Sequence, residues 1–184
     1  MIYIRVFFAI EFNDEVKDYI YDRQKIVREI SKKGNFTLKN NIHLTLKFIG
    51  EVNSNEMDTL KKAVDVAANQ NAAFKIVMDK AGKFDRGNQS IVWIGIERNS
   101  RLEKINNDLE QVLSQWGYEK ENRKFKPHIT VGRQVVFKEQ ESLSHISVSK
   151  AAVINKISLM ESKRVDGVLT YVPLYSKMLL EDRG

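Results

Sequence analysis

The chain contains no cysteine, and only two prolines and three histidines occur among its 184 residues. The absence of cysteine excludes a disulfide framework, a thiolate zinc site and a cysteine nucleophile. Pro127 and Pro173 stand far apart, and no low-complexity tract or proline-rich linker divides the chain. A chain of this length forms one large domain or two small lobes. We therefore expect residues 1–184 to form a single bilobal domain.

Long hydrophobic runs are also missing. The most apolar stretch, MIYIRVFFAIEF at the start, is interrupted by Arg5 and ends at Glu11. It is shorter than the roughly 20 apolar residues that cross a bilayer. The internal charge and the lack of a small-residue cleavage site argue against a secretory signal. Because targeting signals and cysteine are both absent, we expect a cytoplasmic protein with no membrane partner. No coiled-coil heptads appear, and we expect a monomer.

The charge balance is moderately basic, with 30 Lys and Arg against 24 Asp and Glu and a formal net charge of +6. Such a surface can bind a polyanion, for example nucleic acid or a nucleotide. It can equally be an ordinary solvated surface. Charge by itself does not decide between the two.

The first half of the chain alternates between strand and helix patterns. Residues 2–10 (IYIRVFFAI) predict a buried strand, and a helix capped by Asn13 or Asp14 is expected to continue to Gly34. Residues 42–50 (IHLTLKFIG) predict the next strand.

A second helix follows near Asn53, where Glu56 is placed for a capping box. Residues 73–84 are a third strand candidate. The chain finishes with two strand-like runs, residues 151–162 and 171–180.

The second half repeats the order of the first. Residues 90–96 (SIVWIGI) predict a strand, and Ser100 with Glu103 gives the capping-box pattern of a helix that ends at Gly117. Residues 127–133 (PHITVGR) predict another strand that carries a histidine. Strand, helix and histidine strand thus occur twice, which indicates an internal duplication. We predict an α+β fold of two pseudo-twofold lobes, each an antiparallel-rich sheet backed by helices, with a central cleft.

The motif His-x-Thr occurs in both histidine strands. Residues i and i+2 of a strand share a face, so His43 lies beside Thr45 and His128 lies beside Thr130. In both strands the apolar residues between and after them point to the other face, toward a core. If the lobes are related by a twofold, the two polar pairs face each other across the cleft.

Two imidazoles and two hydroxyls in one cleft suit in-line displacement at phosphorus. A histidine with a pKa of roughly 6.5 can give or take a proton at neutral pH. One ring can activate the attacking oxygen while the other protonates the leaving oxygen, and the hydroxyls can bind the non-bridging oxygens. Such chemistry needs no metal or other cofactor.

A zinc site and a purely structural role are the alternatives to catalysis for these histidines. A zinc site would use the two histidines as ligands, but a third protein ligand is usual and neither motif supplies one. His145 has no Thr partner and no counterpart in the first half, which favours a surface or capping residue. A single His-x-Thr is most often structural, and only its repetition at matching places favours catalysis.

The paired HLTLKFIG and PHITVGR motifs, with RVFFAIEF at the start, resemble the 2H phosphoesterase superfamily over the whole chain. Within it the chain is most similar to RNA 2',3'-cyclic phosphodiesterases, also called 2'-5' RNA ligases. The resemblance implies hydrolysis of RNA ending in a 2',3'-cyclic phosphate, or of cyclic nucleotides, to a 2'-phosphomonoester. By the same resemblance His43 is the proton donor, His128 is the proton acceptor, and Thr45 and Thr130 hold the phosphate oxygens.

Arg133 and Phe48 match the family's basic and aromatic positions, which implies substrate binding by a phosphate clamp and by stacking on a base. Strict alternation places both on the face opposite to the histidines. A bulge at Gly132 could redirect Arg133, whereas Phe48 could equally be a core residue. Lys47 shares the His43 face and is expected in the cleft or as a solvated lysine.

Three other functions remain open at this point. The same groups could catalyse the reverse reaction, 2'-5' ligation of tRNA halves. The protein could be a non-catalytic module that binds RNA 3' ends, or it could hydrolyse another cyclic or 2'-5' linked nucleotide.

Overall fold

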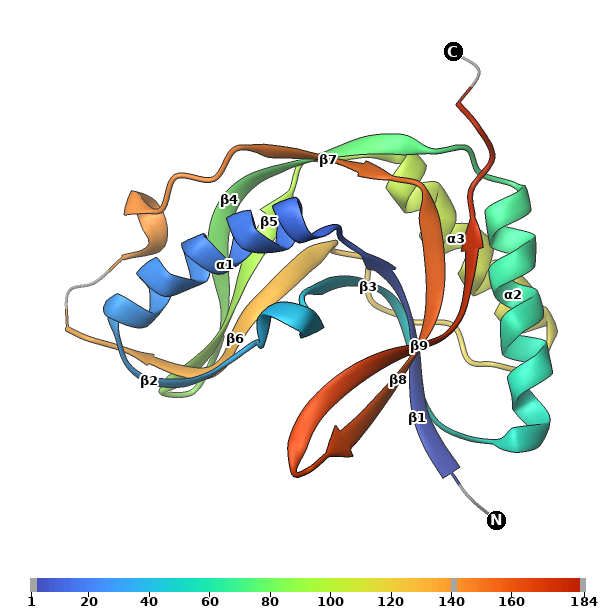
Figure 1. The fold of residues 1–184 in the computed structure, drawn as a ribbon, viewed down its shortest axis with the longest axis horizontal. Coiled ribbons are helices and arrows are strands. Elements are labelled where there is room, and N and C mark those ends of the chain that lie inside the picture. Colours follow the sequence, from blue (N-terminus) through green and yellow to red (C-terminus); the bar gives the residue numbers. More distant parts are fainter. Residues whose placement is uncertain (1–2, 140–141, 183–184) are drawn as a thin grey trace.

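The computed structural model describes residues 3–139 and 142–182. Two antiparallel sheets form the molecule (Figure 1), with strand orders β3-β1-β8-β9 and β2-β6-β5-β4-β7. The strands are β1 (Tyr3–Glu11), β2 (Ser31–Phe36), β3 (His43–Asn53), β4 (Phe74–Arg86), β5 (Gln89–Ile96), β6 (His128–Phe137), β7 (Lys150–Ile154), β8 (Lys156–Val165) and β9 (Val168–Met178). The α-helices are α1 (Asp14–Glu29), α2 (Met57–Asn69) and α3 (Ser100–Gln115). The 3-10 turns are η1 (Lys39–Asn41), η2 (Ser54–Glu56) and η3 (Leu143–His145).

The predicted duplication is visible in the strand order. The sequence β3-β1-β8-β9 of one sheet corresponds to β6-β5-β4-β7 of the other, and β2 is added beside β6. Each histidine strand therefore pairs with the first strand of its own repeat, β3 with β1 and β6 with β5. The prediction of an α+β fold with two related antiparallel sheets is confirmed.

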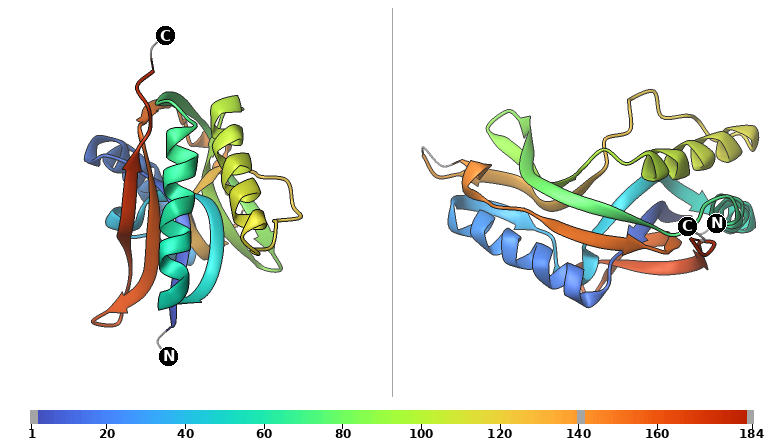
Figure 2. Two further views of the ribbon diagram at one scale, coloured as in Figure 1. Left: turned by 90° about the vertical axis from the view of Figure 1, so that its right-hand side faces the viewer. Right: turned by 90° about the horizontal axis from the view of Figure 1, so that it is seen from above.

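The helices are exchanged between the two repeats. Helix α1 follows β1 of the four-stranded sheet but packs against β2, β6 and β7 of the other sheet. Helix α3 follows β5 yet packs against β3, next to α2, and these two helices lie side by side over the four-stranded sheet (Figure 2). Each repeat thus supplies the helix that supports the histidine strand of the other repeat.

Three local predictions were wrong. Helix α1 ends at Glu29, and Gly34 lies in β2, because residues 31–36 pair with the otherwise free edge of β6. The side chain of Asn99, not Ser100, caps α3 by accepting a hydrogen bond of 3.0 Å from the Leu102 backbone N–H.

The predicted strand run 151–162 is two strands, β7 and β8, which separate at Asn155 and enter different sheets. The capping box at Asn53 and Glu56 is confirmed, and it opens η2 directly before α2.

One cluster of buried apolar side chains connects the two sheets and the three α-helices. It includes the predicted undersides of both motifs, because Leu44, Ile129 and Val131 are fully buried. Phe48, by contrast, is 59% exposed, so strict alternation fails within β3. In the described part of the chain, no helix has the length and apolar content that crossing a membrane would need.

Candidate active site

All six predicted site residues line one cavity of about 160 Å³ between the two sheets. His43, Thr45 and Phe48 come from β3, and His128, Thr130 and Arg133 come from β6. Four further residues, which the sequence did not indicate, complete its wall: Phe7, Thr37, Ser162 and Tyr171. The volume suits a phosphate group and is well below the roughly 300 Å³ at which pockets for larger ligands begin.

The two histidine rings are held in the same way. His43 Nδ1 lies 2.7 Å from the carbonyl oxygen of Asn41, and His128 Nδ1 lies 2.7 Å from that of Lys126, in each case two residues earlier. A carbonyl can only accept a hydrogen bond, so Nδ1 carries a proton in both rings. Nε2 of each neutral ring is therefore left as the acceptor that can take or return a second proton.

Aromatic side chains surround both rings. The His43 ring centroid lies 5.0 Å from those of Phe7 and Tyr171, the latter edge to face. The His128 ring lies edge to face against Phe84 at 5.3 Å. These contacts restrict each imidazole to one orientation.

Asn41 connects His43 to strand β9. Its side-chain amide donates to the Leu169 carbonyl at 2.8 Å, and its Oδ1 accepts from the Tyr171 backbone N–H at 3.1 Å. Because the Asn41 carbonyl also accepts from His43, the ring is positioned by a strand distant in sequence.

Burial lowers the pKa of His43 below its usual value. The hydrogen bond to the Asn41 carbonyl and the charge of Glu11 oppose this shift, whereas Arg133 and His128 reinforce it. His43 Nε2 lies 2.9 Å from the Thr45 hydroxyl, which donates to it while the ring is neutral. An anion in the cavity would favour the protonated ring by direct charge attraction.

A bulge in β3 explains the exposure of Phe48. Thr45 is opposite Ala9 of β1, but Lys47 is opposite the next residue, Phe8, so Leu46 is an extra residue. A bulge of this kind reverses the alternation beyond it.

The same irregularity occurs in β6. Thr130 is opposite Trp93 of β5, and Gly132 is opposite Val92, so Val131 is the extra residue. The bulge expected at Gly132 is thus present one residue earlier, at the corresponding place in both repeats.

Because of the two bulges, the side chain five residues after each histidine faces the cavity again. These residues are Phe48 in β3 and Arg133 in β6, and both line it. Their positions are equivalent in the two repeats, but one is aromatic and the other cationic. The cavity is therefore asymmetric, with a flat apolar wall on one side and a positive charge on the other.

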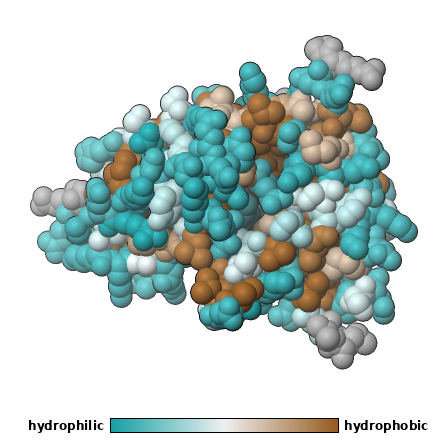
Figure 3. Space-filling view, viewed as in Figure 1, coloured by the Kyte–Doolittle hydropathy of each residue, from teal (hydrophilic) through white to brown (hydrophobic). Residues whose placement is uncertain are grey.

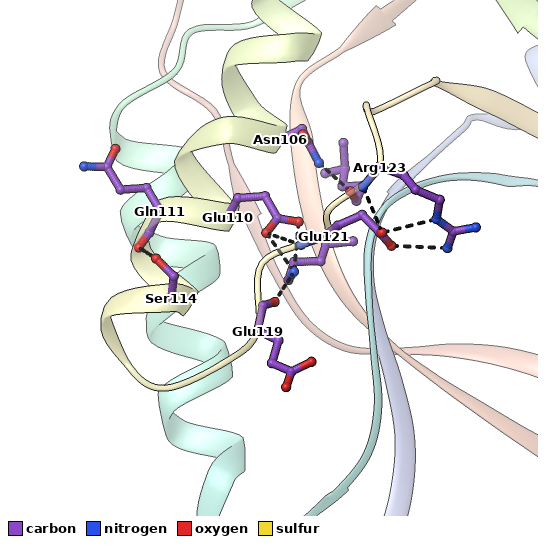
Figure 4. Close-up of polar contacts among 9 residues, drawn as sticks. Asn106, Glu110, Gln111, Ser114, Glu119, Glu121 and Arg123 are labelled. Atoms are coloured by element: carbon purple, nitrogen blue, oxygen red, sulfur yellow. Dashed lines mark hydrogen bonds and ion pairs between the residues drawn. The ribbon is translucent and has the colours of Figure 1, made fainter.

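Lys47 does not lie in the cleft, and both sequence expectations for it were wrong. The bulge turns it to the opposite face, where it is buried and its ammonium group lies 2.8 Å from Glu110 Oε1 on α3. It also donates to the backbone carbonyl of Glu119 at 3.0 Å. Figure 4 shows Glu110 directed from α3 toward the segment that carries Glu119 and Glu121.

A buried helix amide binds each bulge. Asn106 of α3 donates from Nδ2 to the Leu46 carbonyl at 2.9 Å (Figure 4), and Gln24 of α1 donates from Nε2 to the Val131 carbonyl at 2.8 Å. Each amide comes from the exchanged helix and reaches the extra residue of the bulge. One sequence feature could have indicated these two amides: each is a polar residue among the apolar residues on the buried face of its helix.

Replacement of Asn106 by leucine is expected to lower the free energy of unfolding by about 1–3 kcal/mol, because the buried Leu46 carbonyl loses its donor. The adjacent Asn107 is exposed, so Asn107→Leu is a matched control with little expected effect. Urea unfolding followed by circular dichroism measures both. Equal stability of the two variants would contradict a role for Asn106 in holding the bulge.

His145 is exposed in η3, away from the cavity lining. Among residues 3–139 and 142–182, no group of three or more His, Cys, Asp or Glu side chains is placed to hold a metal ion.

Comparison with known proteins gives consistent results. A family model described as the 2'-5' RNA ligase superfamily matches residues 24–165. A relative from Thermotoga maritima, named RNA 2',3'-cyclic phosphodiesterase, is 32% identical over 134 residues, covering 71% of this chain and 70% of the relative. A relative of the same name from Escherichia coli (strain K12) is 28% identical over 173 residues, covering 92% and 93%.

The fold also matches solved structures. One is the crystal structure of E. coli LigT complexed with 3'-AMP, with a TM-score of 0.79 and 26% sequence identity. The match covers 97% of this chain and 99% of that chain.

Proposed function

The chain belongs to the 2'-5' RNA ligase superfamily of 2H phosphoesterases, and from this premise we propose that it is an RNA 2',3'-cyclic phosphodiesterase that works without a metal. Its substrates are RNA 2',3'-cyclic phosphate ends and nucleoside cyclic phosphates, and its products are 2'-phosphomonoesters. The observation that carries the proposal is that both histidines, both threonines and Arg133 line one phosphate-sized cavity. The names of the relatives support the same activity.

In the proposed reaction each of the two histidines transfers one proton. His128 Nε2 takes a proton from water, whose oxygen attacks phosphorus in line with the bond to the 3' oxygen. That bond breaks as His43 Nε2 delivers its proton to the 3' oxygen, and the phosphate remains on the 2' oxygen. General acid and base catalysis of this kind contributes about 10²–10⁴-fold for each group.

The remaining cavity residues stabilise charge. Protonated His43 no longer accepts at Nε2, so the Thr45 hydroxyl is released to donate to a non-bridging oxygen. Thr130 occupies the equivalent place in the second repeat, and Arg133 supplies a full positive charge. Phe48 offers a flat surface on which the terminal base can stack.

The test of this function is incubation with each 2',3'-cyclic nucleotide and with a cyclic-ended oligoribonucleotide in excess EDTA. We expect turnover that EDTA does not reduce, with a 2'-phosphate as product. A 3'-phosphate product or loss of turnover in EDTA would contradict the mechanism. Binding without any turnover would instead identify a non-catalytic module for RNA 3' ends.

Ligation is a second candidate, because the family model carries that name and the same groups can catalyse opening of the cyclic phosphate by a nucleophile other than water. A 5'-hydroxyl would replace water as the attacking group. Incubation of tRNA halves, with the extent of joining measured at equilibrium, decides whether joining or hydrolysis prevails. A cytoplasmic location and a monomeric state stay predictions.

The pKa of His43 predicts a specific pH dependence. As proton donor His43 must be protonated, and burial lowers its pKa in the free protein. The kcat/KM profile reports the free enzyme and the kcat profile reports the complex. Since the bound phosphate anion raises the pKa of the ring, the alkaline limb of kcat/KM is expected at lower pH than that of kcat. Rates measured from about pH 4.5 to 9 test this, and coincident limbs would contradict it.

A further inference from the structure

A second and larger hollow adjoins the phosphate-sized cavity. It has a volume of about 650 Å³ and shares Thr37, Arg133 and Tyr171 with the cavity. Its walls come from β2, from the β4–β5 hairpin with Arg86, and from the β8–β9 hairpin with Arg164. We call this hollow the hairpin groove, since the two hairpins form its outer sides.

The hairpin groove is strongly positive. Three arginines line it, Arg86, Arg133 and Arg164, and no aspartate or glutamate does. Within the described residues none of the three has an acidic partner; Arg164 donates to the Gly167 carbonyl at 2.7 Å. Four arginines elsewhere, Arg5, Arg98, Arg101 and Arg123, are ion-paired. Positive charge without an acidic partner thus lines the groove from its outer sides, at Arg86 and Arg164, to the cavity, at Arg133, and such a surface favours a polyanion.

The groove also presents apolar and aromatic surface. Phe36, Leu38, Ile91 and Leu169 line it, and Leu38 and Leu169 are 47% and 41% exposed. Apolar side chains gather at the end of the β8–β9 hairpin (Figure 3), where Val165 and Val168 are also exposed. Cations interspersed with apolar and aromatic side chains are typical of surfaces that bind single-stranded nucleic acid.

We propose that the hairpin groove binds the RNA strand on the 5' side of the terminal nucleotide while the cyclic phosphate occupies the cavity. This proposal rests on the proposed function. The cavity of about 160 Å³ holds a phosphate group, whereas the groove of about 650 Å³ has room for a nucleotide. Arg86 and Arg164 bind backbone phosphates, and the exposed apolar side chains contact sugar and base. The enzyme therefore prefers a cyclic-ended oligonucleotide over a cyclic mononucleotide.

The test compares kcat/KM for a 2',3'-cyclic mononucleotide and a cyclic-ended tetraribonucleotide in the wild type and in the double variant R86A/R164A. The expected result is a loss of about tenfold or more on the tetranucleotide, since hydrogen bonds to charged groups are the strong ones. Hydrolysis of the mononucleotide is expected to stay unchanged. The matched control is R98A/K62A, which removes two exposed positive charges outside the groove.

Binding of a tetranucleotide that ends in a 2'-phosphate, followed by fluorescence anisotropy, separates this proposal from the proposed function. If the wild type hydrolyses neither substrate, the proposed function fails. Weaker binding by R86A/R164A but not by R98A/K62A would still support the groove. Equal losses on both substrates, equal losses in the two double variants, or no loss on the tetranucleotide would each overturn the proposal.

Discussion

Replacement of either His43 or His128 by alanine is expected to lower kcat on a 2',3'-cyclic nucleotide by about 10²–10⁴-fold. The proposed mechanism gives each ring a separate proton transfer, so neither can replace the other. Both rings are fixed through Nδ1 by a backbone carbonyl, and Nε2 does the chemistry.

Asparagine variants of the two histidines test whether proton transfer, and not only the hydrogen bond to the carbonyl, is required. The amide N–H of asparagine can take the place of Nδ1–H toward the carbonyl, but it cannot transfer a proton at neutral pH. His43→Asn and His128→Asn are therefore expected to be as inactive as the alanine variants. His145→Ala is the matched control, because His145 is exposed and does not line the cavity.

Steady-state kinetics in EDTA, with folding checked by circular dichroism, measure these effects. Wild-type rates in both single variants would exclude paired-histidine catalysis. Loss of activity in only one of them would leave a single catalytic histidine and would require a different base or acid.

Replacement of Lys47 by methionine is expected to lower the free energy of unfolding by about 3–5 kcal/mol, because it leaves the largely buried carboxylate of Glu110 without its ammonium partner. The two side chains are only 6% and 15% exposed. For a chain of this size the loss corresponds to a fall in Tm of roughly 6–20 °C.

The double variant K47M/E110L is the critical comparison. An apolar pair of similar volume is often as stable as a buried ion pair, so the second substitution is expected to restore much of the lost stability. Lys25→Met removes an exposed lysine that is paired with Asp22 at 2.9 Å, and its Tm is expected to stay near that of the wild type. A small effect of Lys47→Met would mean that water solvates Glu110 once the ammonium group is removed.

Lys47 also influences the second histidine strand. It donates to the Glu119 carbonyl, and Glu110 accepts from the Glu121 backbone N–H at 3.2 Å. Both contacts hold the segment that leads from α3 to His128. The lysine beside the first motif therefore supports the approach to the second, a role that no reading of HLTLKFIG alone could indicate.

The sequence by itself was sufficient for the duplicated strand–helix–strand order, the α+β class and the pairing of His43 and Thr45 with His128 and Thr130. These features depend on local periodicity and on repetition, and both can be recognised directly in the amino-acid sequence. The positions of Phe48 and Arg133 came only from the family resemblance, since alternation predicted the wrong face for each.

Only the tertiary structure decided the bulges, the exchange of helices and the hairpin groove. A bulge depends on the neighbouring strand and on a helix amide that is distant in the sequence. Gln24 is 107 positions from Val131, and Asn106 is 60 positions from Leu46. One extra residue reverses every side chain that follows it. For that reason Lys47 faces the core and Phe48 and Arg133 face the cavity, although the alternation of the sequence predicts the reverse.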